Sequence, residues 1–133
     1  AVAAKFAWMK KKAIKLNVAA AFHSKLMQSA ADEFIETAKT VEFKTANVDV
    51  YSNVLGTKLE DFSAMPDMLA KHIVSPVKFT SELAEMEKAG YENFIELGPN
   101  KVLTGLVKKT LKGKNAVNIE NNATMEKALA SLS

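Results

Sequence analysis

The stretch AAAFHSKLM, residues 19–27, joins two segments of different periodicity. Residues 13–22 alternate apolar and polar side chains as far as Val18, a pattern with a period of two that predicts a strand. From Ser24 to about Val41, the apolar residues recur at helical spacing and lie on one face. A strand that leads directly into a helix predicts an α/β unit, and His23 lies at the junction.

The rest of the chain repeats this alternation of strands and helices. We predict strands at 48–54, 93–98 and 115–119, and helices at 1–12, 62–74, 79–90, 101–113 and 123–132. This order predicts an α/β architecture with a mostly parallel sheet, and Gly90 is expected as a left-handed helix terminus. In a chain with only three or four strands, both faces of a parallel sheet are hard to cover. In addition, Ala1 lies inside a predicted helix without an N-cap. We therefore expect the chain to be part of a larger fold.

The composition excludes several classes of protein. Hydrophobic residues make up 48% and charged residues 25% of the 133 positions, as in ordinary globular domains, and no apolar run approaches the roughly 20 residues that span a bilayer. There is no cysteine, which excludes disulfides and thiolate metal sites, and we expect a cytoplasmic protein. A net charge of +3, with no arginine among the basic residues, is too small to indicate nucleic-acid binding.

Two histidines are the candidates for chemistry. His23 follows a predicted strand and precedes a helix, where ligands bind in open α/β sheets, and this position suits a general base. The alternative for His23 is a turn histidine that is hydrogen-bonded to the backbone. His72 lies late in its helix and is by itself more typical of a packed or helix-terminal residue. The two histidines form no metal-ligand pattern, so we expect no metal.

Other features carry weaker signals. No glycine-rich phosphate loop and no G-x-S-x-G nucleophile elbow is present, and Ser24 is expected to be a helix N-cap. A run of lysines near the C-terminus would attract an acidic partner, or would form a solvated helix face; it contains Lys108, Lys109 and Lys112.

Four stretches, taken in this order, resemble a known family. They are LNVAAAFHSKLMQSAADEF (16–34), VDVYSNV (48–54), HIVSPVKF (72–79) and FIELGPNKVLTGLVKK (94–109). They are similar to the C-terminal part of malonyl-CoA:acyl carrier protein transacylases, the acyltransferases that load malonyl groups for fatty-acid synthesis. The resemblance implies an α/β-hydrolase-like core with an inserted ferredoxin-like subdomain. Residues 1–20 would then end the small subdomain, and residues 21–133 would form the C-terminal part of the core.

The resemblance also implies roles for single residues. In the family, a serine attacks the malonyl thioester and a histidine activates that serine; His23 matches this histidine. A backbone carbonyl at the position of His72 would orient the His23 ring. Phe22 would narrow the space beside the acyl α-carbon, and Asn53 would lie near the floor of the site. Malonyl-CoA would be the substrate and acyl carrier protein the acceptor, with no cofactor. Lys108, Lys109 and Lys112 are then a candidate docking surface for the acidic carrier protein, because complementary charge steers association.

The sequence departs from the family pattern in three respects. The family usually has glutamine at His72, and Asn100 replaces the second glycine of a Gly-Pro-Gly turn, where asparagine is expected to adopt left-handed geometry. The family's serine, oxyanion loop and malonate-binding arginine would all lie upstream of Ala1. We therefore expect this chain alone to be inactive. The alternatives are the acyltransferase domain of a polyketide synthase, and a non-catalytic fragment or interaction module of the same fold.

Overall fold

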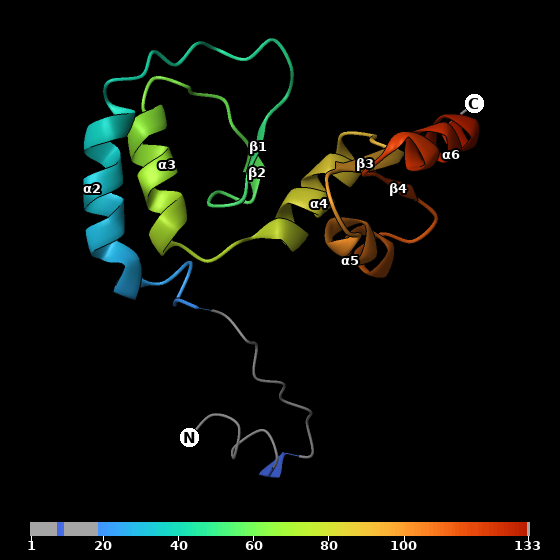
Figure 1. Cartoon of the computed structure of the whole chain (residues 1–133), viewed down its shortest axis with the longest axis horizontal. Coiled ribbons are helices and arrows are strands. Elements are labelled where there is room, and N and C mark those ends of the chain that lie inside the picture. Colours follow the sequence, from blue (N-terminus) through green and yellow to red (C-terminus); the bar gives the residue numbers. More distant parts are fainter. Residues whose placement is uncertain (1–7, 10–18, 133) are drawn as a thin grey trace.

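The computed structural model describes residues 8–9 and 19–132 (Figure 1). The expected helix at 1–12, apart from Trp8 and Met9, and the expected strand at 13–18 lie outside the described residues. The described residues form a mixed α/β structure, as the sequence predicted.

The first half of the described chain is a pair of helices with a small hairpin. It contains the 3₁₀ helix η1 (Lys25–Met27), α2 (Gln28–Ala38), β1 (Tyr51–Ser52), β2 (Thr57–Lys58) and α3 (Met65–Val74). Helices α2 and α3 pack side by side (Figure 1). The predicted cap is confirmed, because the side chain of Ser24 accepts the N–H of Leu26 at 3.3 Å and begins η1.

The second half alternates helices with two strands. It contains α4 (Phe79–Lys88), β3 (Asn93–Leu97), α5 (Val102–Thr110), β4 (Asn115–Ile119) and α6 (Asn122–Leu132). Strands β3 and β4 are parallel, with Phe94 opposite Ala116. The predicted elements in this half are confirmed to within a few residues, and Gly90 has the expected positive φ of 87°.

The prediction of one mostly parallel sheet is wrong for the described residues. Strand β1 has two residues instead of the seven predicted, and it pairs with β2 in an antiparallel hairpin that is separate from β3 and β4. The cause is the turn between the two strands: the N–H of Gly56 donates to the carbonyl of Ser52 at 2.6 Å, and φ of Gly56 is 77°. A side chain at position 56 would adopt this geometry only with strain, and its Cβ would lie 2.8 Å from that of Ser81.

The main core is small and lies between α4, α5 and the β3–β4 pair. Leu83, Val107, Leu111 and Ala116 are buried there. By contrast, Leu97 at the end of β3 is 78% exposed and Val102 at the start of α5 is 65% exposed. Large apolar side chains are seldom grouped on a surface that is meant to face water, so this end of the sheet is suited to packing against further protein.

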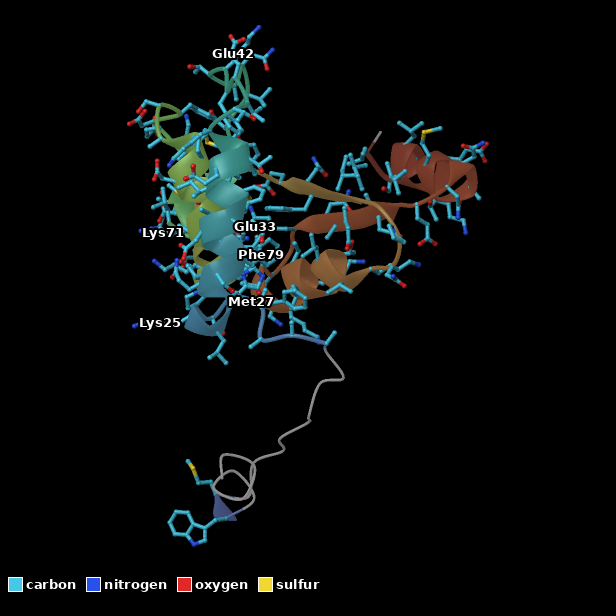
Figure 2. All side chains as sticks on the ribbon, turned by 60° about the vertical axis from the view of Figure 1, so that its left-hand side comes forward. Lys25, Met27, Glu33, Glu42, Lys71 and Phe79 are labelled. Carbon is cyan, nitrogen blue, oxygen red and sulfur yellow. The ribbon has the colours of Figure 1, made fainter. Side chains whose placement is uncertain are left out.

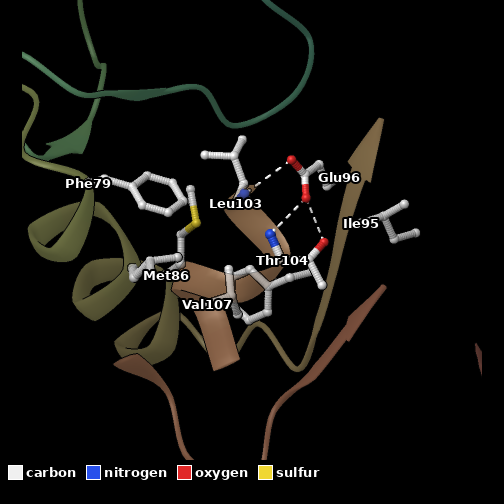
Figure 3. A pocket seen from close by; sticks show the side chains of 9 residues that line it. Phe79, Met86, Ile95, Glu96, Leu103, Thr104 and Val107 are labelled. Carbon is white, nitrogen blue, oxygen red and sulfur yellow. Dashed lines mark hydrogen bonds between the residues drawn. The ribbon is translucent and has the colours of Figure 1, made fainter. Parts of the chain in front are cut away.

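A carboxylate from β3 holds the start of α5 (Figure 3). One oxygen of Glu96 accepts the N–H of Leu103 at 3.1 Å, and the other accepts the N–H and the hydroxyl of Thr104 at 2.8 and 2.7 Å. The hydroxyl of Thr104, followed by the backbone N–H groups, lowers the pKa of Glu96. Asn100 is left-handed, as predicted, with a φ of 72°, and its carbonyl accepts the side-chain amide of Asn118 at 2.8 Å.

We expect Glu96→Gln to lower the melting temperature at pH 7, because an amide oxygen is a weaker acceptor than a carboxylate at a helix N-terminus. The folded-state pKa of Glu96 lies below its ordinary value of 4.5, so its contribution is present above pH 4.5 and is lost as the pH falls through the folded pKa. The difference between wild type and variant should therefore narrow below about pH 4. Glu87→Gln, at an exposed position on α4, is the matched control. Equal melting temperatures at pH 7 would contradict the capping role.

Candidate active site

His23 has an unusual backbone conformation. Its φ is 58°, in the left-handed region that few residues other than glycine occupy and in which histidine is enriched. Its backbone N–H donates to the carbonyl of Ile73 at 3.1 Å, and its ring Nδ1 lies 2.9 Å from the carbonyl oxygen of His72. Both donors of one residue are thus bound by consecutive carbonyls at the end of α3.

These carbonyls are available because of Pro76. In a continuing α-helix, the carbonyl of His72 would accept the N–H of residue 76, four positions later. Proline has no N–H, and it also forces the preceding residue out of helical geometry. Ser75 is accordingly extended, with φ −105° and ψ 147°, and α3 ends at Val74. The sequence therefore frees acceptors at the position where His23 supplies donors.

This contact determines the tautomer of His23. A carbonyl can only accept a hydrogen bond, so Nδ1 carries the proton and Nε2 keeps its lone pair in the neutral ring. The end of a helix carries about half of a negative charge, which stabilises a ring that has gained a proton. In the described part of the chain, Nε2 of His23 has no hydrogen-bond partner. The arrangement provides a base that is oriented through Nδ1 and whose Nε2 can accept a proton.

An apolar pocket lies beside this base. His23 and His72 both line it, together with Phe22, Met27, Ala30, Phe34 and Ile73. Figure 2 shows Met27 at the end of the helix next to the segment that carries His23. Phe22 is 60% exposed, so its ring borders the pocket without being enclosed by it. None of the described residues that line the pocket is acidic.

The side chain of His72 faces a different neighbour. Its Nε2 lies 3.5 Å from the hydroxyl of Ser52, which is buried in β1. Burial, and then the charge of His23, lower the pKa of His72 below its ordinary value of 6.5. Burial therefore favours the neutral form of His72.

The structure brings together only some of the residues that the sequence singled out. Phe22, His23 and His72 meet at one pocket, whereas Asn53 does not line it. The backbone carbonyl of Asn53 instead accepts the N–H of Lys78 at 2.8 Å. The three lysines lie on or just after α5, away from the pocket.

Sequence reasoning missed two contributors to the site, Ser52 and Pro76. Pro76 lies four residues after His72, and this spacing was the available signal for a free carbonyl. No pattern in the sequence pointed to Ser52, because a strand of two residues is too short to show a periodic pattern of apolar and polar side chains.

The described residues contain no group of three or more His, Cys, Asp or Glu side chains that could hold a metal ion. Within the same residues, no helix is long and apolar enough to cross a membrane.

Comparison with known proteins decides the family. The model of the acyl transferase domain matches residues 4–130. The chain belongs to this family. It is 35% identical over 122 residues to the malonyl CoA-acyl carrier protein transacylase of Bacillus subtilis, a match that covers 92% of this chain and 38% of that protein. The chain thus spans about two fifths of the length of this relative.

Solved structures of acyl transferases share the fold. The malonyl CoA-acyl carrier protein transacylase of Clostridium perfringens superposes with a TM-score of 0.92 at 32% identity, covering 97% of this chain and 41% of that one. A malonyl-transacylase in complex with a type II PKS acyl-carrier protein superposes with a TM-score of 0.83 at 28% identity, covering 91% of this chain and 39% of that one. The likeness therefore extends to relatives in polyketide synthesis as well.

We expect Pro76→Ala to weaken the hold on His23. Residue 76 gains an N–H that competes for the carbonyl of His72, and α3 can extend by part of a turn. Histidine ring NMR should then show faster exchange of the Nδ1 proton of His23, while the free energy of unfolding falls by about 0.5–1 kcal/mol through the more flexible unfolded chain. Pro99→Ala, in the turn between β3 and α5, is the control. An unchanged Nδ1 signal in Pro76→Ala would show that the proline does not keep this carbonyl free.

Proposed function

We propose that this chain carries the catalytic base of a malonyl-CoA:acyl carrier protein transacylase that serves fatty-acid biosynthesis. The observation that carries the proposal is the contact of 2.9 Å between Nδ1 of His23 and the carbonyl oxygen of His72, which leaves Nε2 unprotonated beside an open pocket. Membership of the acyl transferase family and the malonyl transacylases among its relatives support the same activity.

The proposed reaction has two half-reactions. A serine from the remainder of the domain attacks the thioester carbonyl of malonyl-CoA while Nε2 of His23 takes the serine proton. The proton then passes to the sulfur of coenzyme A as it leaves, and a malonyl-serine ester remains. The thiol of the carrier protein next attacks this ester, giving its proton to Nε2, and His23 returns the proton to the serine oxygen. No cofactor takes part in this scheme.

The other predicted residues have supporting roles in the proposal. Phe22 borders the pocket beside His23 and would disfavour acyl groups with a methyl branch, an effect worth about 1–3 kcal/mol per methyl group. Asn53 would lie near the floor of the completed site. We further propose that residues 21–133 are the C-terminal part of an α/β-hydrolase-like core, that residues 1–20 end a ferredoxin-like subdomain, and that the enzyme is cytoplasmic.

The acidic carrier protein would bind at the lysines on α5 and just after it. Lys108, Lys109 and Lys112 are exposed and have no ion-pair partner among the described residues. Lys108 also lines a groove with Lys101 and Lys127, which lies between α5 and α6. Positive charges of this kind accelerate the encounter with an acidic partner more than they strengthen the final complex.

Two alternatives differ in what they predict. The acyltransferase domain of a polyketide synthase would transfer the same group to a carrier protein of polyketide synthesis, and the family likeness fits both. A non-catalytic fragment or interaction module would keep the fold and gain no acyl group. The left-handed backbone and the two hydrogen bonds of His23 favour a catalytic role, because such backbone strain is typically kept at functional sites.

The decisive measurement is the intact mass of the complete domain before and after incubation with malonyl-CoA. We expect a gain of one malonyl group, and no gain for this chain by itself because it lacks the serine elbow. In the complete domain, His23→Ala should slow malonyl transfer by about 10³-fold or more, since the nucleophile loses its base. Lys25→Ala, two positions away, is the control. Transfer at the wild-type rate by His23→Ala would contradict the proposed role.

The docking surface has its own test. We expect Lys108→Gln, Lys109→Gln and Lys112→Gln together to raise the KM for acyl carrier protein about 3–10-fold at low salt, while the KM for malonyl-CoA stays unchanged. Lys39→Gln, Lys44→Gln and Lys88→Gln together change the net charge equally at other sites and serve as the control. Equal effects of the two triple variants would show that only net charge matters.

A further inference from the structure

Ser52 occupies a buried position from which it contacts two side chains of α3. It is 4% exposed, and its hydroxyl lies 3.7 Å from Sδ of Met68 and 3.5 Å from Nε2 of His72. The same oxygen accepts the N–H of Leu55 at 3.5 Å. A hydroxyl offers one donor and two acceptor positions. All three are used if the hydroxyl donates to Met68 and accepts from both Leu55 and a protonated Nε2 of His72.

His72 therefore connects two parts of the structure through different atoms. Its side chain reaches Ser52 in the β1–β2 hairpin, and its backbone carbonyl holds the ring of His23. The last turn of a helix lacks intrahelical partners for its carbonyls and frays readily. A carbonyl in that turn stays in place only if something else fixes the residue that carries it.

We propose that the side chain of His72, held by Ser52, is a positioning residue for His23. The Ser52–His72 contact anchors the last turn of α3 to the hairpin, and thereby fixes the carbonyl that orients the base. The kinetic consequence rests on the malonyl transfer proposed above, whereas the effect on the Nδ1 proton of His23 is independent of any activity.

The electrostatic surroundings agree with this role. His23 and His72 line the same apolar pocket, so a charge on His72 would oppose the charge that His23 gains when it accepts a proton. Among the described residues that line this pocket, His23 is the titratable group besides His72, and neither an acidic residue nor a lysine is present. Burial lowers the pKa of His72 and so favours the neutral ring, which donates to Ser52 in the tautomer that carries its proton on Nε2.

The first test is NMR of the complete domain labelled with ¹⁵N-histidine, in which His23→Asn assigns the signals of His23. In the wild type, we expect a slowly exchanging Nδ1 proton on His23. Ser52→Ala should broaden or remove this signal, whereas Ser29→Ala, at an exposed position on α2, should leave it intact. An unchanged signal in Ser52→Ala would overturn the proposal even if the enzyme transfers malonyl groups as proposed.

The second test is kinetic and separates positioning from binding. Ser52→Ala and His72→Leu should each lower kcat about tenfold with little change in the KM for malonyl-CoA, because misplacing a base costs rate and not affinity. His72→Gln should recover most of the lost kcat, because its amide can donate to Ser52 and its backbone carbonyl remains. If Ser52→Ala does not fold, His72→Leu carries the test with the buried serine in place. Wild-type kcat in His72→Leu, or a kcat for His72→Gln as low as that of His72→Leu, would overturn the proposal.

A wild-type domain that transfers no malonyl group would refute the proposed function alone. The NMR comparison would then still decide whether Ser52 and His72 position His23.

Discussion

The hydrogen bond from the His23 ring to the carbonyl of His72 is the interaction on which the site depends. It joins residues 49 positions apart and sets the tautomer of the candidate base, His23, at the pocket. A second bond, from the backbone of His23 to Ile73, keeps the ring from turning away at the cost of a left-handed φ. That cost, of order 1 kcal/mol, is offset by satisfying two carbonyls that would otherwise end the helix without partners.

Much of the local structure could be predicted from the sequence, because helices and buried strands leave a clear period. The helices from α2 onward and the strands β3 and β4 were accessible in this way, and the Ser24 cap from its place at the start of a helical pattern. The left-handed Asn100 was expected from the resemblance, because it replaces a glycine of the family's Gly-Pro-Gly turn. The hairpin was not accessible, because two-residue strands are too short to show a period, and a glycine turn decides their pairing. Sheet order depends on long-range contacts that a pattern of residues does not encode.

The residues of the site also differ in whether the sequence could predict their contacts. His23 was accessible from its place between a strand pattern and a helix pattern, and from the resemblance to a family. The contact with His72 came from the resemblance alone, although Pro76 gives it a local physical reason. The link from Ser52 to His72 could not be predicted, because it joins side chains 20 positions apart through the packing of α3 against a hairpin.

A carbonyl in place of a carboxylate behind the base suits the proposed substrate. In the familiar serine–histidine–aspartate arrangement, the carboxylate stabilises the charged imidazole, but a buried carboxylate costs several kcal/mol in lost hydration. The end of α3 supplies a smaller stabilisation, about 0.3–2 kcal/mol, without placing a full charge in an apolar pocket. A malonyl group carries a carboxylate of its own, and a second negative charge close to it would oppose its binding. The absence of acidic residues from the described lining of the pocket follows the same requirement. A helix end therefore orients the base while leaving the pocket open to an anionic acyl group.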